Sequence, residues 1–176
     1  MPWKKTPEHK ALRKQQWRQI DFNGNGLLSL AEFDKGVIDV LKLPLIAEKK
    51  AVLIRAFNAA KGKQAAKTMH SDDYVEETEY RHLLKYLRIY FELWIAFERI
   101  DIDGDQRLTY KEFCLAKNLL SKWRINMADP KQQWTECDRN NGGVVLFDEF
   151  AAWAIKKNLD LDDDDDDDSD TESDGP

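Results

Sequence analysis

Three twelve-residue segments of the chain repeat one spacing of oxygen-bearing side chains. They read DFNGNGLLSLAE at 21–32 (loop 1), DIDGDQRLTYKE at 101–112 (loop 3) and DRNNGGVVLFDE at 138–149 (loop 4). Each begins with Asp, carries Asp or Asn at the third place and ends with Glu at the twelfth. A loop around a hard cation turns alternate residues inward, and a twelfth-place carboxylate offers both its oxygens. The spacing therefore predicts the calcium loop that joins the two helices of an EF-hand.

The residues around these loops favour the same interpretation. An aromatic residue stands four places before each loop, namely Trp17, Phe97 and Trp134. Another follows each loop directly, namely Phe33, Phe113 and Phe150. The eighth place is apolar in each, being Leu28, Leu108 or Val145, as suits a short β-bridge between two loops. Because EF-hands pair, we expect an all-α fold of four EF-hands in two pairs, with short β-bridges between paired loops.

The fourth hand that pairing requires is found at residues 68–79, TMHSDDYVEETE (loop 2). This register places Val75 at the eighth position and Glu79 at the twelfth. The first and sixth positions hold Thr68 and Asp73, so the leading carboxylate and the turn glycine are both missing. We expect a degenerate, structural hand that binds no metal. The alternative is a weak site built from Asp72, Glu76 and Glu79.

Helices follow from the positions of the loops and from their start signals. We expect them near 7–20, 30–41, 47–59, 77–100, 110–123, 130–137 and 147–158, with 77–100 forming one long helix or two abutting ones. The expected organisation is a basic N-terminal segment at 1–19, a first EF-hand pair at 20–88, a second pair at 89–159 and a disordered acidic tail at 160–176. The tail holds eleven acidic residues and no Lys or Arg, so it is not expected to form a core.

Loops 1 and 3 are predicted to be the firm calcium sites. The ligands expected in loop 1 are the side chains of Asp21, Asn23, Asn25 and Glu32, the carbonyl of Leu27, and Ser29 directly or through water. Those expected in loop 3 are the side chains of Asp101, Asp103, Asp105, Thr109 and Glu112, with the carbonyl of Arg107. Gln106 stands where the turn favours glycine. A left-handed backbone there costs about 1–2 kcal/mol, which weakens the site without abolishing it.

Loop 4 has fewer donors. Gly142 and Leu146 remove the oxygens of the fifth and ninth places. The remaining ligands are the side chains of Asp138, Asn140 and Glu149 and the carbonyl of Val144. We expect weak calcium binding at loop 4, or none unless its partner loop is filled. Calcium is the expected ion, and Mg²⁺ at rest stays an open alternative.

Charge and composition bound the remaining functions. The first 19 residues hold six basic groups and one acidic group, and we expect them to form the entering helix of the first hand with a solvated basic face. The alternative is a weak contact of this segment with anionic lipid or a microtubule. No apolar run is long enough to span a membrane, and two cysteines favour an intracellular, reduced protein. His9, His70 and His82 are scattered, and no phosphate-binding glycine loop is present. Neither an enzyme nor a nucleic-acid-binding protein is expected.

Segments outside the loops resemble one family. LPLI (43–46), AFNAAK (56–61), SDDYVE (71–76), YFEL (90–93) and FDEFAAWA (147–154) are similar to the flagellar calcium-binding proteins of kinetoplastids, the calflagins. The resemblance covers roughly residues 20–160 and implies a four-hand calcium protein of the flagellum. Family members carry an acylated N-terminal glycine and a nearby palmitoylated cysteine. Pro2 stands in the place of that glycine, so we expect a flagellar, ciliary or cytoplasmic protein without an N-terminal acyl anchor.

The expected function is that of a calcium sensor, which exposes an apolar surface to a protein partner when its loops fill. The sequence leaves the partner's identity open. Two alternatives remain: a calcium buffer that opens little, and a structural component of the axoneme whose EF-hands are partly vestigial.

Overall fold

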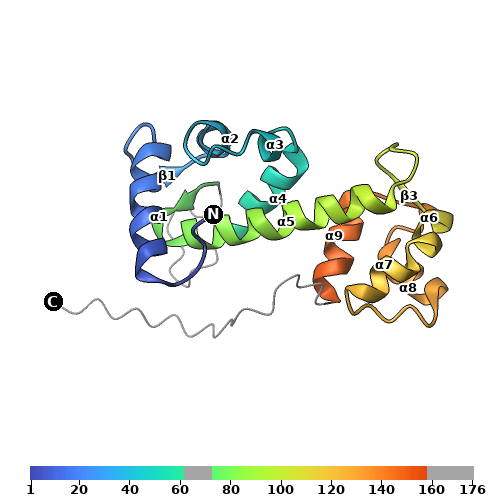
Figure 1. Cartoon of the computed structure of the whole chain (residues 1–176). Helices are drawn as coiled ribbons and strands as arrows, with labels where there is room; N and C mark the ends of the chain where they lie inside the picture. The colour runs from blue at the N-terminus through green and yellow to red at the C-terminus, as the bar shows by residue number, and fades with distance from the viewer. Residues whose placement is uncertain (62–72, 158–176) are drawn as a thin grey trace.

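The computed structural model describes residues 1–61 and 73–157, in which helices are interspersed with two-residue strands. The elements are α1 (Pro7–Ile20), β1 (Leu27–Leu28), α2 (Leu30–Asp39), α3 (Pro44–Ala47), α4 (Lys50–Ala60), β2 (Val75–Glu76), the 3₁₀ turn η1 (Glu77–Glu79), α5 (Tyr80–Ile100), β3 (Leu108–Thr109), α6 (Tyr110–Leu115), α7 (Lys117–Lys122), α8 (Pro130–Cys137), β4 (Val144–Val145) and α9 (Phe147–Lys156). Helices α1 to α4 gather near one end of the long helix α5, and α6 to α9 near the other (Figure 1).

The loops pair through the eighth-place residues. Strands β1 and β2 run antiparallel with Leu28 opposite Val75, and β3 and β4 with Leu108 opposite Val145. All four side chains are fully buried. The all-α fold of four EF-hands in two pairs, with short β-bridges, is therefore confirmed. Hands 1 and 2 form the first pair, and hands 3 and 4 form the second.

Local sequence signals explain where the helices begin. Thr6 caps α1, whose first residue is Pro7, and Asp129 caps α8, whose first residue is Pro130. Proline suits the first helical position because the N–H it lacks has no partner inside the helix. The exiting helices α2 and α6 begin with capping boxes, Ser29 with Glu32 and Thr109 with Glu112. The predicted helices at 7–20 and 130–137 match α1 and α8.

Two predicted helices differ from those of the structure. The helix expected at 47–59 is α4, preceded by the separate turn α3 that Pro44 begins. The helix expected at 110–123 becomes α6 and α7, which meet at Ala116, where ψ is 2°. The segment 77–100 is one helix, α5, after the turn η1. The expected limit between the pairs, at 88–89, falls inside α5, so no loop separates them.

Helix α5 contributes buried side chains to both pairs. Leu83, Leu84 and Leu87 in its first half are fully buried, and Trp94 and Phe97 in its second half are also buried. Helix α4 packs lengthwise against α5, and α9 packs against it from the second pair (Figure 1). One continuous helix therefore gives the two pairs a shared core rather than two independent ones.

The first residues of the basic N-terminal segment fold back on the first pair. Pro2 is buried, and the Arg13 side chain donates from Nη1 to the carbonyls of Pro2 (3.0 Å) and Lys4 (2.7 Å). The guanidinium of Arg88 on α5 lies 4.9 Å from the Trp3 ring centre. The acidic tail expected at 160–176, with Thr68 and Asp72 of loop 2, lies outside the described residues. Within the described ranges, no helix is long and apolar enough to cross a membrane.

Candidate metal sites

The first-place aspartate is held in the same way in loops 1, 3 and 4. Its Oδ2 atom accepts a hydrogen bond from the sixth-place N–H, which is that of Gly26 (2.9 Å), Gln106 (2.9 Å) or Gly143 (3.0 Å). Its Oδ1 atom accepts a second N–H, from Asn25, Gly104 or Gly142. The three aspartates are buried although they are charged. Backbone N–H groups therefore close each loop around the carboxylate that begins it.

The twelfth-place glutamate ties each loop to its exiting helix. In loop 1, Glu32 accepts on Oε2 from the N–H (3.0 Å) and hydroxyl (2.7 Å) of Ser29. In loop 3, Glu112 accepts from the same groups of Thr109 at 2.8 and 2.7 Å. Each glutamate is also the third residue of its helix. A change in the position of this carboxylate therefore acts directly on α2 or α6.

The other oxygen of each glutamate reaches back across its loop. Glu32 Oε1 accepts from Asn23 Nδ2 at 2.8 Å, and Glu112 Oε1 accepts from the Ile102 N–H at 2.9 Å. Burial acts to raise the pKa of Glu112, but hydrogen bonds from the Thr109 side chain and from the backbone of Thr109, Ile102 and Asp103 together lower it. Glu112 is therefore ionised at neutral pH, as a ligand of a hard cation must be.

Loop 3 gathers the densest negative charge. Asp101, Asp103 and Asp105 each place a carboxylate oxygen within 4.8 Å of the others. In residues 1–61 and 73–157, no other His, Cys, Asp or Glu residues form such a group of three. Loop 1 has Asn23 and Asn25 at the matching places, and these turn the same way: Asn25 Oδ1 accepts from the Leu27 N–H as Asp105 Oδ1 accepts from Arg107, both at 2.8 Å. The two loops thus differ in charge more than in shape.

The turn at the sixth place has a left-handed backbone in loops 1, 3 and 4. The φ angle is 77° at Gly26, 78° at Gly143 and 64° at Gln106. A residue with a Cβ pays about 1–2 kcal/mol for this conformation, whereas glycine does not. The conformation expected of Gln106 from the sequence is therefore present, and loop 3 carries the strain.

Loop 4 keeps the frame with looser contacts. Glu149 accepts from the N–H groups of Leu146 (3.3 Å) and Asn140 (3.4 Å), and no hydroxyl stands at the ninth place. The fifth place is Gly142, whose N–H donates to Asn140 Oδ1. Because glycine has no side chain, this place offers no side-chain oxygen to an ion. The Val144 carbonyl lies in β4 opposite Thr109. The donor set still suits calcium, but fewer of its atoms are fixed.

Loop 2 retains only the end of the calcium loop among its described residues. Glu79 is almost fully buried, and its Oε2 accepts from the Glu76 N–H at 3.1 Å. Val75 occupies the expected strand position, and Tyr80 follows at the start of α5 with a buried ring. The twelfth-place glutamate therefore serves as a buried helix-start residue in this hand. Sequence spacing had identified Glu79 by register, although nothing in it indicated such deep burial.

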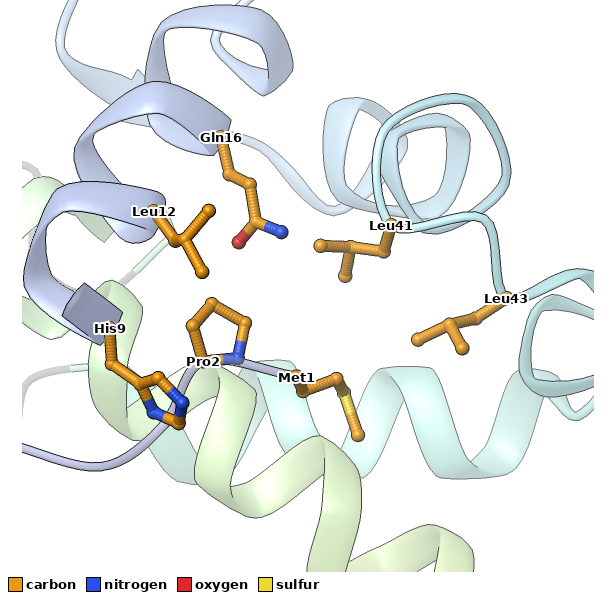
Figure 2. A pocket seen from close by; sticks show the side chains of 7 residues that line it. All are labelled: Met1, Pro2, His9, Leu12, Gln16, Leu41 and Leu43. Atoms are coloured by element: carbon orange, nitrogen blue, oxygen red, sulfur yellow. The ribbon is translucent and has the colours of Figure 1, made fainter.

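A surface pocket lies apart from the loops, between α1, the N-terminal residues and the segment that follows α2. Its volume is about 310 Å³, and it is lined by Met1, Pro2, His9, Leu12, Gln16, Leu41 and Leu43 (Figure 2). Leu12 and Gln16 come from α1, whereas Leu41 and Leu43 follow α2. The lining is mostly apolar, and sequence spacing gave no sign of it, because the pocket depends on how the N-terminal residues fold back.

Known proteins similar to this chain carry calcium-binding names. The family model of the FCaBP EF-hand domain matches residues 1–87. Flagellar calcium-binding protein TB-24 of Trypanosoma brucei brucei is 35% identical over 163 residues, covering 92% of this chain and 75% of the relative. Flagellar calcium-binding protein TB-1.7G of the same organism is 35% identical, covering 92% and 71%. The flagellar calcium-binding protein of Trypanosoma cruzi is 35% identical over 162 residues, covering 91% and 77%.

Proposed function

The chain belongs to the flagellar calcium-binding protein family of EF-hand proteins, and we propose that it acts there as a calcium sensor. Loops 1 and 3 are its main calcium sites, and loop 4 is a weaker third site. Filling of loop 1 or loop 3 moves the exiting helix and changes the apolar surface offered to a protein partner. The alternative within the same family is a calcium buffer, which binds the ion with little change of surface.

The observation that carries this proposal is the double role of the twelfth-place glutamates. Glu32 and Glu112 are the predicted bidentate calcium ligands, and each also fixes the first turn of its exiting helix through Ser29 or Thr109. A cation that draws both carboxylate oxygens toward itself competes with these hydrogen bonds. Because the glutamates are helical residues, such a rearrangement turns α2 or α6 relative to the helix that precedes the loop.

The pocket of hand 1 supports a sensor more than a buffer. It is formed between α1 and the segment after α2, so a change in the angle between these helices changes its shape (Figure 2). Leu12 at its edge is 47% exposed. EF-hand sensors offer apolar surfaces to helical partners, and this pocket beside α1 and the segment after α2 would serve as such a surface.

Dye binding distinguishes the two functions. A probe whose fluorescence rises on apolar surfaces is added to the full chain, with calcium and with chelator, alongside a calorimetric calcium titration. A sensor gives calcium uptake and a calcium-dependent rise in dye signal. Calcium uptake with an unchanged dye signal identifies a buffer. The variant Glu32→Gln with Glu112→Gln serves as the control, and it is expected to lose the calcium uptake of loops 1 and 3 together with the dye response.

We also propose a flagellar location, because the relatives are named as flagellar proteins. A fluorescently tagged chain expressed in Trypanosoma brucei, the organism of two of the relatives, is expected along the flagellum. A uniform cytoplasmic signal would contradict this location without bearing on calcium binding. A structural role in the axoneme is the other candidate, and loop 2 favours it, since its twelfth-place glutamate is buried among protein groups. Retention of the chain on axonemes after detergent and chelator would support that role.

A further inference from the structure

We propose that the first turn of α9 couples the calcium sites of the second pair to loop 1 in the first pair. This inference rests on the proposed function, since it concerns how the same calcium sites influence one another. It requires that residues next to the ligand Glu149 contact the first pair, and that this contact continues to the ligand Glu32. The structure contains both.

Phe147 provides the apolar part of the contact. It stands two residues before Glu149, at the start of α9, and is buried. Its ring centre lies 4.7 Å from that of Trp94 and 5.8 Å from that of Phe97, both on α5 and both edge-to-face. Trp94 in turn lies under Lys49, whose ammonium is 5.1 Å from the ring centre. Trp94 is therefore held between the second pair and the residue that precedes α4.

Asp148 provides the charged part of the contact. Its carboxylate accepts a hydrogen bond from Nε of Arg55, which lies on α4 in hand 2 of the first pair. The Arg55 side chain is 25% exposed and that of Asp148 is 65% exposed. Asp148 directly precedes Glu149. A shift of Glu149 toward an ion therefore also shifts the partner of Arg55 and the ring of Phe147.

Helix α4 leads from this contact to loop 1. Its Phe57 lies two residues beyond Arg55, and the ring centre of Phe57 is 6.1 Å from that of Phe33 on α2. Both rings are almost fully buried, and Phe33 directly follows the ligand Glu32. The two loops are thus connected to α4 in a similar way. Asp148, next to Glu149, contacts Arg55 of α4, and Phe33, next to Glu32, contacts Phe57 of α4. Spatial continuity is not by itself coupling, so the inference depends on a measured effect between the sites.

Coupling between sites is reciprocal, so calcium at loop 4 changes the affinity of loop 1 by the same factor as the reverse. The exposed ion pair limits the effect that Arg55 carries. Exposed pairs are worth little, and the expected change in the loop 1 midpoint is about two- to fivefold. Phe147 adds to this, but its truncation also removes buried packing, so Arg55 and Asp148 are the better residues to vary.

The test is an amide NMR titration of the full chain with calcium. The Gly26 N–H donates to Asp21 and reports on loop 1, whereas the Gly143 N–H donates to Asp138 and reports on loop 4. The midpoint at Gly26 is compared between the wild type and Glu112→Gln with Glu149→Gln, which disables the second pair. We expect a two- to fivefold difference. The same comparison in an Arg55→Ala background is expected to give a smaller difference, and Asp148→Asn the same result.

Asn58→Ala is the matched control. Asn58 lies on the same helix as Arg55, and its side chain is exposed. Its substitution is expected to leave the difference between intact and disabled second pairs unchanged. The inference is overturned if Gly26 titrates identically whether or not the second pair is disabled, or if Arg55→Ala behaves as Asn58→Ala does. A Gly26 amide that never responds to calcium would instead refute the proposed function at loop 1, and the coupling with it.

Discussion

Hands 1 and 3 form nearly the same loop hydrogen bonds but differ in the charge of their ligand sets and in backbone strain. In both, the first-place aspartate accepts the sixth-place N–H at 2.9 Å, and the twelfth-place glutamate accepts a hydroxyl at 2.7 Å. Hand 1 combines an unstrained Gly26 turn with only two carboxylates in its ligand set. Hand 3 combines four carboxylates with the strained Gln106 turn. Backbone strain and ligand charge are therefore separable in this protein. Hand 1 has the less strained turn, and hand 3 has the more negative ligand set.

The largest expected effect on calcium affinity comes from the twelfth-place glutamate, which both hands have. Glu32→Gln and Glu112→Gln each remove one charged, two-oxygen ligand. Loss of an outer-shell partner alone costs about 10–100-fold in metal affinity, so we expect each change to weaken its own loop by more than about 100-fold. Calorimetry on the single and double variants measures this loss. Glu48→Gln, at an exposed glutamate before α4, is the control that should leave uptake unchanged. A loop that binds normally after its own substitution is not the calcium site.

Close helix packing distinguishes hand 1 from hand 3. A Cβ built on Gly36 of α2 would lie 2.0 Å from Cγ1 of Ile20, whose side chain is fully buried. Hand 3 has Ala116 at the equivalent place. Gly36→Ala is expected to lower the free energy of unfolding by about 1–3 kcal/mol through overpacking.

Urea denaturation measures the effect of Gly36→Ala. The control is Ala11→Ser on the exposed face of α1. That change should move stability by less than about 0.5 kcal/mol. An unchanged denaturation midpoint in Gly36→Ala would show that the two helices separate more easily than their contact implies.

A reciprocal exchange at the sixth place isolates the turn. No atom lies within 4 Å of a Cβ built on Gly26, so Gly26→Gln adds backbone strain without a steric clash. We expect it to lower the free energy of unfolding in saturating calcium by about 1–2 kcal/mol. Gln106→Gly should raise it, but by less than about 1 kcal/mol, because glycine also gains freedom in the unfolded chain. Effects of the same sign in both variants would contradict the assignment of strain to Gln106.

A reciprocal exchange at the fifth place isolates the charge. Asn25→Asp and Asp105→Asn preserve the side-chain oxygen that accepts the seventh-place N–H, so the shape of each loop is retained. The first change should tighten loop 1 and the second should weaken loop 3, each by about tenfold or less, which corresponds to about 1.4 kcal/mol.

Salt provides the check on this interpretation. Screening at higher ionic strength should reduce the calcium affinity of loop 3 more than that of loop 1. The Asp105→Asn variant should make this difference in salt dependence smaller. Calorimetric titrations at two salt concentrations measure the difference. Equal salt dependence in the two loops would mean that the extra carboxylates of loop 3 do not contact the ion.

Local chemistry explains why most of the fold was predictable from the sequence. Caps such as Ser29 with Glu32 act within three residues, and the eighth-place Leu28 and Val75 needed only the loop register to be paired. The strained Gln106 was likewise predictable, because every loop of this kind makes the same turn. These features depend on neighbours in sequence or on a repeated motif, so the sequence of this chain alone was sufficient to predict them.

Long-range contacts were not predictable in the same way. The burial of Pro2 depends on Arg13 and on the surface of hand 1, and the pairing of Arg55 with Asp148 joins residues 93 positions apart. The division of 110–123 at Ala116 has no local signal in the sequence, since alanine by itself favours a continuous helix. Such contacts follow from the assembled core rather than from any local pattern.

A crystal structure of the full chain grown in excess calcium tests the central claim most directly. Density for an ion is expected in loops 1 and 3, surrounded by oxygens of Asp21 and Glu32 in one and of Asp101 and Glu112 in the other, at about 2.3–2.6 Å. Both glutamates should bind through two oxygens. Ordered loops that hold no ion in either place would contradict calcium sensing by this protein.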